Sequence, residues 1–211
     1  MPLGLNISRL PLVIFLLLVL GSLAVGFATI YEIVATNSRG EYLHFENEII
    51  KMNFPKNWVG ISWEEKNLTS GTKYGIFLAP PQMISTVLFR IHSEQATRYF
   101  MKEHNLTDAS SVVSFEINRM YNYSLTKNEN ASIISRESGE VIVSGNKANY
   151  SKIIIKDGII YNGVYYNMTF LIISYIENQK LVQIAFLGKK EDCEKSSDLF
   201  KAILNSTEIR V

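Results

Sequence analysis

The stretch Val164–Leu187, VYYNMTFLIISYIENQKLVQIAFL, decides the fold class of this 211-residue chain. Two apolar runs rich in β-branched and aromatic residues flank a polar turn at 177–180, which is the pattern of an antiparallel hairpin. The run Phe170–Ile173 does not alternate with polar residues, so we expect its strand to be covered on both faces. The sequence therefore predicts a central antiparallel sheet with a layer on each side.

Helical patterns supply the predicted layers. A final helix is expected from about Glu191, because Cys193, Phe200 and Ile203 share one apolar face that also includes Ser197 and Leu204. Two more helices are expected at 94–102 and 110–123. Further strands are expected at 48–54, 58–63, 74–78, 86–91, 133–143 and 148–156, the last ending at Asp157-Gly158, with another turn at Asn162-Gly163. Together these elements predict an α+β fold, an α/β/α sandwich around the antiparallel sheet.

The amino-terminal part of the chain predicts a different environment. No charged residue lies between Arg9 and Glu32, and the apolar run Leu10–Tyr31 would span roughly 33 Å as a helix, against a bilayer core of about 30 Å. A cleaved signal peptide has a shorter apolar region, although small residues around Gly26 and Ala28 leave that alternative open. We therefore predict an uncleaved transmembrane helix, with Arg9 on the cytoplasmic side.

Four segments follow from this placement of the anchor. We expect a short cytoplasmic amino terminus at 1–9, the transmembrane anchor at 10–31, a linker at 32–41 and one extracytoplasmic domain at 42–211. Residues 32–39 are expected to extend the anchor helix as far as Gly40. The predicted localisation is the cell membrane, as a single-pass protein.

Asn-x-Ser/Thr triplets support the extracytoplasmic placement. The chain has eight of them, whereas its 17 asparagines and 30 serines and threonines predict about 2.4 by chance. Seven follow the anchor and are our N-glycosylation candidates: Asn67, Asn105, Asn122, Asn130, Asn149, Asn167 and Asn205. Asn6 would lie in the cytoplasm and stay unmodified. Many glycan sites without a disulfide framework favour an archaeal surface protein over a eukaryotic one.

Composition and motifs exclude several function classes. A net charge of +1 argues against nucleic-acid binding, and a single cysteine excludes an internal disulfide, a cysteine zinc site or a CxxC redox pair. The three histidines, His44, His92 and His104, have no metal-site spacing, and no nucleophile elbow or phosphate-binding loop occurs. Cys193 is interpreted as an inert core residue. We therefore predict no catalytic residues, no cofactor and no metal.

Tyrosines cluster on one predicted hairpin. Tyr161, Tyr165 and Tyr166 surround the Asn162-Gly163 turn, where exposed rings could stack on a sugar or a protein partner. The alternative is that they only cover the edge of the sheet. These three tyrosines are our candidates for a partner surface.

Three segments resemble the PsbP-like family, named after the extrinsic lumenal protein of photosystem II. Ile49–Trp58 is similar to its opening strand and Pro-x-x-Trp turn, Gly145–Tyr150 to its Gly-x-x-Ala-x-Tyr entry to a central strand, and Phe170–Ile209 to its closing strands and last helix. The resemblance covers roughly residues 42 to 210. It implies an α/β/α sandwich in a mostly non-catalytic family of accessory subunits and binding modules. The metal-binding residues of the plant proteins have no match here, and we interpret Trp58, Gly145 and Ala148 as packing residues.

These observations favour a non-catalytic, membrane-anchored accessory or binding protein, a subunit or assembly partner of a membrane or envelope complex. Two alternatives remain open at this stage. One is a structural glycoprotein of the cell envelope. The other is a surface hydrolase or metal-dependent enzyme whose site is hidden among the three histidines and nearby carboxylates.

Overall fold

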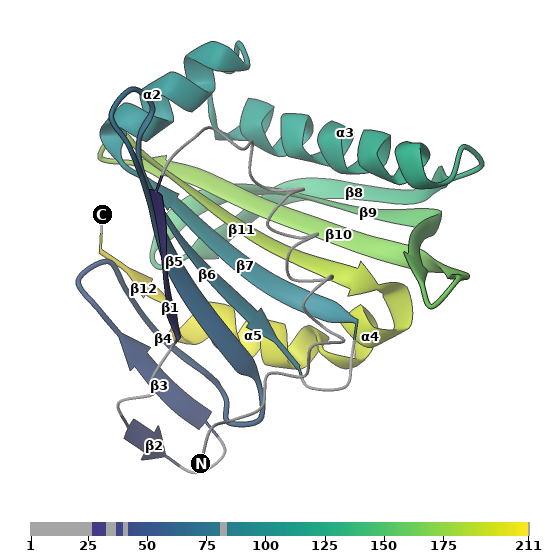
Figure 1. Cartoon of the computed structure of the whole chain (residues 1–211), viewed down its shortest axis with the longest axis horizontal. Coiled ribbons are helices and arrows are strands. Elements are labelled where there is room, and N and C mark those ends of the chain that lie inside the picture. Colours follow the sequence, from purple (N-terminus) through teal and green to yellow (C-terminus); the bar gives the residue numbers. More distant parts are fainter. Residues whose placement is uncertain (1–26, 33–36, 40–41, 81–83, 211) are drawn as a thin grey trace.

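The computed structural model describes residues 27–32, 37–39, 42–80 and 84–210, with side chains from residue 42 onward. Its main element is an eight-stranded sheet in which every neighbouring pair is antiparallel, in the order β1-β5-β6-β7-β11-β10-β9-β8 (Figure 1). The strands are β1 (Phe27–Glu32), β5 (Val59–Asn67), β6 (Gly71–Ala79), β7 (Ser85–His92), β8 (Ser132–Val143), β9 (Asn146–Tyr161), β10 (Val164–Glu177) and β11 (Lys180–Lys189). This sheet confirms the predicted antiparallel centre of the fold.

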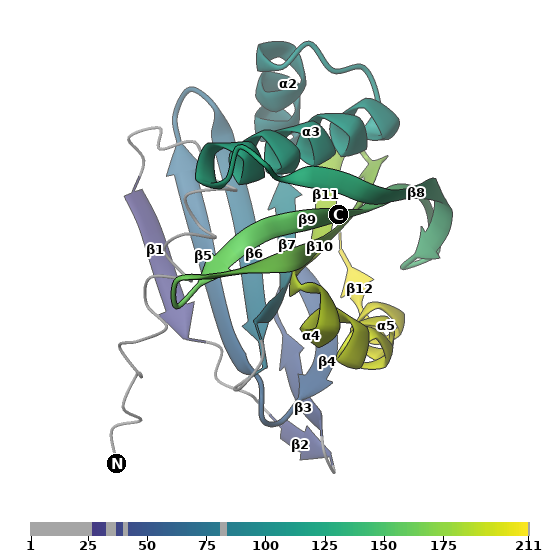
Figure 2. The same ribbon diagram turned by 90° about the vertical axis from the view of Figure 1, so that its right-hand side faces the viewer.

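Helices lie on both faces of the main sheet (Figure 2). One face carries α2 (Glu94–Glu103) and α3 (Ala109–Lys127), and the other carries α4 (Lys190–Lys195) and α5 (Ser197–Ser206). The second layer differs from a simple sandwich, because a smaller antiparallel sheet shares it with the helices. Its strands are β2 (Asn37–Arg39), β3 (Tyr42–Glu46), β4 (Ile50–Pro55) and β12 (Glu208–Ile209), in the order β12-β4-β3-β2. The strand expected at 48–54 is β4, and it belongs to this small sheet.

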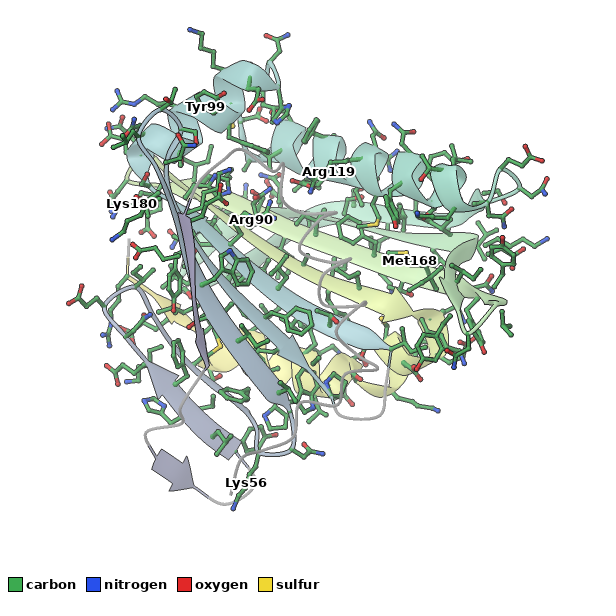
Figure 3. The ribbon with its side chains drawn as sticks, in the orientation of Figure 1. Lys56, Arg90, Tyr99, Arg119, Met168 and Lys180 are labelled. Carbon is green, nitrogen blue, oxygen red and sulfur yellow. The ribbon has the colours of Figure 1, made fainter. Side chains whose placement is uncertain are left out.

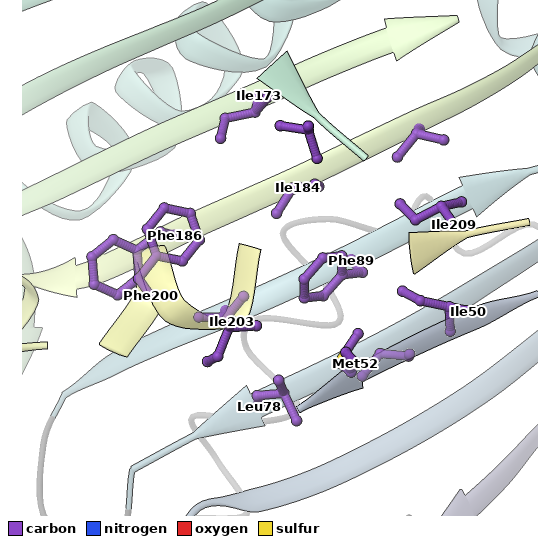
Figure 4. Close-up of a cluster of buried hydrophobic side chains, with 14 of the residues drawn as sticks. Ile50, Met52, Leu78, Phe89, Ile173, Ile184, Phe186, Phe200, Ile203 and Ile209 are labelled. Atoms are coloured by element: carbon purple, nitrogen blue, oxygen red, sulfur yellow. The ribbon is translucent and has the colours of Figure 1, made fainter. Parts of the chain in front are cut away.

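The alternation of side chains along the central strands divides the core into two parts. On β10, Phe170 and Ile172 pack toward α3, while Ile173 and Tyr175 pack toward α4 and α5. The non-alternating apolar run is therefore explained by burial on both faces, as predicted. In the α5-side core, Phe186 of β11 and Phe200 of α5 stack with ring centroids 4.6 Å apart (Figure 4).

The turns confirm two of the sequence-based interpretations and correct a third. Asn178 and Gln179 both have positive φ and join β10 to β11 in a two-residue turn. Trp58 donates its backbone N–H to the Pro55 carbonyl at 2.9 Å and is buried, as its Pro-x-x-Trp pattern predicts. Gly145 corrects our packing interpretation: an added Cβ would meet nothing within 4 Å, and its φ of 81° shows that the β8–β9 turn requires glycine.

Two predicted boundaries in the second half of the chain were wrong. The last helix is broken into α4 and α5 at Ser196, a fully buried residue whose hydroxyl lies 3.3 Å from that of Ser85 on β7. Strand β9 does not end at Asp157-Gly158, because it bulges there and continues to Tyr161. Turn residues at that point mark an irregularity inside a strand instead of its end.

The amino-terminal prediction also needs correction where the structure describes it. Phe27–Glu32 is strand β1, paired along β5 as the outer strand of the main sheet, so residues 27–31 are not the end of a helix. Of the expected helical extension, Glu32 is the last residue of β1 and Asn37–Arg39 form β2, so these residues are not helical, while 33–36 lie outside the described residues. Residues 1–26, which hold Asn6, the expected cytoplasmic segment and most of the predicted anchor, lie outside the described residues. None of the helices described has both the length and the apolarity that crossing a bilayer requires.

Candidate functional site

A cluster of polar side chains lies between the main sheet and the helices α2 and α3. The strand register brings it together, because Arg90 of β7 is paired with Gln183 of β11, and His92 is paired with Lys73 of β6. Arg119 approaches from α3, opposite Arg90 on the sheet (Figure 3). Because successive side chains of a strand point to opposite faces, these polar residues all lie on the face of the sheet that α3 covers.

A chain of hydrogen bonds runs through this polar cluster. His92 Nε2 donates to Gln183 Oε1 at 3.2 Å, and Gln183 Nε2 donates to Glu116 Oε1 at 3.1 Å. The other Glu116 oxygen pairs with the Arg119 guanidinium at 2.6 Å. Glu116 is only 2% exposed, so both of its oxygens are engaged inside the protein. The cluster therefore ties α3 to two strands of the sheet.

Burial and neighbouring charges set the protonation states of Arg90 and His92. Burial lowers the pKa of the Arg90 guanidinium to about 10, an effect opposed by the carboxylate of Glu116 and strengthened by Arg119. Burial, followed by the charges of Arg90 and Lys73, lowers the pKa of His92 well below its usual value. At neutral pH the cluster thus holds a charged Arg90 next to an uncharged His92, which acts as a hydrogen-bond donor.

The three histidines do not come together. His92 and His104 both contact the ring of Phe100, with centroids 5.4 Å and 4.8 Å away, and His104 stacks on Phe115. His44 lies instead on β3, where its ring nitrogens contact Asn53 and Glu46. Among the residues with a described position, no group of three or more histidine, cysteine, aspartate or glutamate side chains could hold a metal ion.

Cys193 is buried, as the sequence predicted. It lies on α4 and belongs to the core that α4 and α5 share with the sheet. Burial raises the pKa of its thiol far above the usual range, so the thiol stays protonated. A protonated, enclosed thiol is a poor nucleophile.

A second feature is the exposed apolar tip of the β9–β10 hairpin. We define this hairpin tip as Ile160, Tyr161, Val164 and Tyr165, four consecutive members of the ladder whose side chains are each 40–50% exposed. The turn between them is Asn162-Gly163, with φ of 49° and 77°, the positive values that a tight two-residue hairpin needs. Two of the three predicted partner-surface tyrosines therefore lie exposed at this tip.

The third tyrosine, Tyr166, sits just below the hairpin tip. It is half-buried against the α3-side core, and the Lys189 ammonium lies 4.3 Å from its ring centroid. The Tyr165 hydroxyl is 3.5 Å from the Lys127 carbonyl at the end of α3. Tyr166 thus supports the hairpin, while Tyr161 and Tyr165 present their rings outward.

The end of α3 braces the base of the hairpin. Ser124, fully buried, donates its hydroxyl to the Gly158 carbonyl at 3.0 Å. The Asn167 side-chain oxygen accepts the Asp157 N–H at 3.2 Å across the bulge. Asp157 itself has φ of 52°, the left-handed conformation. These bonds hold the bulge in one shape, so the tip is presented on a fixed support.

The seven candidate glycosylation residues fall into two groups. The side chains of four are exposed: Asn105, Asn122, Asn130 and Asn205. The other three, Asn67, Asn149 and Asn167, are half-buried. Asn67 accepts backbone N–H bonds from Thr69 and Ser70 through its side-chain oxygen, and Asn167 accepts one from Asp157.

Sequence reasoning missed two parts of these features. Arg90, Glu116 and Gln183 lie far apart in the chain. Strand register brings Arg90 beside Gln183, and the packing of α3 on the sheet adds Glu116. Ile160 and Val164 belong to the hairpin tip but were not named beside the tyrosines. Their exposure could have been predicted, because they are apolar residues close to a predicted two-residue turn, which lies too far from the core to bury them.

Comparison with known proteins gives no family assignment. No protein-family profile and no curated protein matches the sequence. Among solved structures, a Bacteroides thetaiotaomicron protein aligns with 77% of this chain at 14% identity and a TM-score of 0.38, and this chain spans 45% of its length.

Two further structures align over most of both chains. The cyanobacterial PsbP of Synechocystis matches at 10% identity and a TM-score of 0.37, covering 90% of this chain and 96% of its own. LpqN of Mycobacterium tuberculosis, described as involved in cell envelope biogenesis, matches at 9% identity and a TM-score of 0.37, covering 87% and 92%. Scores this low do not establish a shared fold or function, so PsbP-like membership stays a prediction.

Proposed function

We propose that this chain is a non-catalytic, membrane-anchored accessory or binding protein whose extracytoplasmic domain docks a protein partner through the hairpin tip. The observation that carries the proposal is the tip itself, four apolar side chains left 40–50% exposed on a braced support. PsbP-like membership, an archaeal origin and an anchor within residues 10–26, before strand β1, belong to the same proposal. They rest on the sequence segments, the glycosylation triplets and the uninterrupted apolar run.

The composition of the tip suits a protein partner. Tyrosine combines a large apolar ring with a polar end, and such residues contribute much of the binding energy at protein interfaces. Ile160 lies opposite Tyr165 and Val164 lies opposite Tyr161, so each aliphatic side chain adds apolar area beside one ring. The two pairs lie on opposite faces of the hairpin tip, because successive side chains of a strand alternate. The brace from α3 means that little conformational freedom is lost when a partner binds.

The side chains that could perform chemistry have structural partners instead. His92 is buried and hydrogen-bonded to Gln183, and His44 lies between Asn53 and Glu46. Cys193 is enclosed in the core with its thiol protonated. These positions favour a binding role over the alternative of a hydrolase or metal-dependent enzyme.

A structural glycoprotein of the cell envelope is the second candidate. Four of the predicted acceptor asparagines, Asn105, Asn122, Asn130 and Asn205, have exposed side chains where a sugar could be carried. Intact-mass measurement before and after deglycosylation tests this role. A mass that does not change on deglycosylation would remove it.

The docking role can be tested by recovering partners of the tagged full-length chain from native membranes. The variant Ile160→Ser/Tyr165→Ser removes apolar area from the tip, and we expect it to recover at least about tenfold less of any specific partner. Ile176→Ser is the matched control, because it changes an exposed isoleucine at the other end of β10. Equal recovery by the tip variant and the control would contradict docking at the tip.

The placement in the membrane needs its own measurement. We expect the mature chain to keep residues 10–26, to resist alkaline extraction from membranes, and to be open to protease from the outer side only. Peptide mass mapping of the mature amino terminus is the direct readout. A mature chain that begins near residue 28 would show a cleaved signal and remove the anchor, while leaving the docking proposal to its own test.

A further inference from the structure

Strand β8 forms a long edge of the main sheet that is open on one side. Within the described part of the chain it is hydrogen-bonded to β9 alone, at the edge of the sheet (Figure 2). Nine of its twelve residues are exposed. The outward N–H and C=O groups of an edge strand form a template on which another strand can pair. From this edge we infer that two copies of the chain associate by antiparallel pairing of β8 with β8, around a two-fold axis at Ser138.

The charges along β8 select that register. When a strand pairs antiparallel with its own copy, facing residue numbers have a constant even sum, so the axis must fall on a residue. An axis at Arg136, Glu137 or Glu140 places a like-charge pair directly opposite. An axis at Gly139 pairs no opposite charges. The axis at Ser138 places Arg136 opposite Glu140 of the copy, and it does so twice.

The same register also brings together the two exposed isoleucines of β8. Ile134 is 54% exposed and Ile142 is 66% exposed, and with the axis at Ser138 each lies opposite the other in the copy. The ladder with β9 shifts between Ile133 and Ser135, so the regular part of the edge begins at Ser135. Ile134 then lies at each end of the paired segment, where it covers Ile142.

The charged residues of this edge are available for such pairing. Glu140 already pairs with Lys147 at 2.9 Å, but both side chains are more than half exposed, so Glu140 can accept a second cation. In the described part of the chain no carboxylate forms an ion pair with Arg136. Pairing two copies here would supply one and would remove the open edge, joining the two main sheets into one.

Charge reversal tests the inferred register in the full-length chain, kept in mild detergent. We expect the wild-type chain to form a dimer that dissociates on dilution, measured by sedimentation equilibrium. Arg136→Glu places glutamate opposite glutamate twice and should weaken the dimer at least tenfold. The double variant Arg136→Glu/Glu140→Arg restores opposite charges and should recover the wild-type dissociation constant to within about threefold. A monomeric wild type, or a double variant no tighter than Arg136→Glu, would overturn the inference.

Arg98→Glu is the matched control for this experiment. It reverses an exposed arginine on α2 that pairs with Glu94, away from β8, and should leave the dimer unchanged. If Arg98→Glu weakens the dimer as strongly as Arg136→Glu, association depends on overall charge and the inferred interface is wrong.

Cross-linking locates the axis directly. Ser138→Cys places two thiols opposite each other at the axis, so a short thiol-reactive cross-linker should join the copies. Ser135→Cys is at another exposed position of the same strand, but in this register its two thiols lie six residues apart, roughly 20 Å along the strand. Because Cys193 is buried, it should not contribute. Cross-linking through Ser135→Cys in preference to Ser138→Cys would overturn the register.

Discussion

The polar cluster under α3 and the hairpin tip both depart from the usual placement of side chains. Charged groups are buried in the cluster, whereas apolar groups are exposed at the tip. Under α3, a glutamate that is 2% exposed is enclosed with arginines and a histidine. At the tip, isoleucine, valine and two tyrosines are left 40–50% exposed. Buried charge is tolerated only with partners, and exposed apolar area contributes nothing to folding until something covers it. The partners of Glu116 in the cluster lie within the molecule, whereas for the tip we propose a partner outside it.

Stability measurements should separate the two regions most strongly at Glu116. Glu116→Ala removes the partner of Arg119 and the acceptor of Gln183, and we expect a loss of about 3–5 kcal/mol in the free energy of unfolding, because a charge is left buried without compensation. Urea denaturation is the measurement. Glu140→Ala, which breaks an exposed pair with Lys147, should cost less than about 1 kcal/mol. Equal losses in the two variants would show that the cluster does not differ from a surface pair.

The pH dependence of stability should report on His92. Because its pKa is lowered in the folded protein, unfolding lets it take up a proton once the pH is below about 6.5, the ordinary value. The stabilising contribution is therefore complete above that pH and falls as the pH is lowered, by up to about 1.4 kcal/mol per pH unit for this one site. Lys73 and Arg90 on the neighbouring strand positions disfavour protonation further.

The variant His92→Gln isolates this contribution. It removes the titrating group, so we expect its free energy of unfolding to fall less between pH 7 and pH 5 than that of the wild type. His44→Gln changes a histidine outside the cluster and should keep the wild-type dependence. A His92→Gln variant with an unchanged dependence on pH would show that His92 does not stay neutral in the folded protein.

The difference between the two regions also explains what could be predicted from sequence. Local patterns placed strands β4 to β11, the helices α2 and α3, and the turn of the tyrosine hairpin, because apolar periodicity and turn residues can be recognised in neighbouring positions. They did not predict β1, β2, β3 or β12, nor the break between α4 and α5. Glu116 could not be assigned in this way, since its partner Gln183 lies 67 residues further along the chain and meets it only through the packing of α3 on β11. The residues around Glu116 do not indicate which distant residue it will contact.

The errors have related causes. The apolar run 10–31 was interpreted as one helix, yet its last residues pair with β5, because β-branched and aromatic residues suit a strand as well as a membrane span. At Asp157-Gly158, the turn residues serve a bulge that Ser124 of α3 stabilises from another layer. In both places a contact distant in sequence decides between two structures that the local sequence allows.

The brace between α3 and the hairpin should have an intermediate effect on stability. Ser124→Ala removes a buried donor and leaves the Gly158 carbonyl without it, so we expect a loss of about 1–2 kcal/mol on urea denaturation. The same substitution also destroys the Asn122 glycosylation triplet. Asn122→Gln is the matched control, because it destroys the triplet at an exposed position and should change stability by less than about 0.5 kcal/mol. If both variants lose the same stability, the effect comes from the missing glycan and the brace is unimportant.

The smallest effect on folding is expected at the hairpin tip. Ile160→Ser/Val164→Ser leaves the turn residues, the bulge and the core unchanged, and the replaced side chains are about half exposed. We therefore expect a change within about 1 kcal/mol in urea denaturation of the isolated chain. In the presence of a partner that covers the tip, the wild type should become more stable and the variant should not, since a ligand that binds only the native state stabilises it in proportion to its affinity. A large loss of stability in the isolated variant would mean that the tip belongs to the fold itself, and the contrast with the polar cluster would then fail.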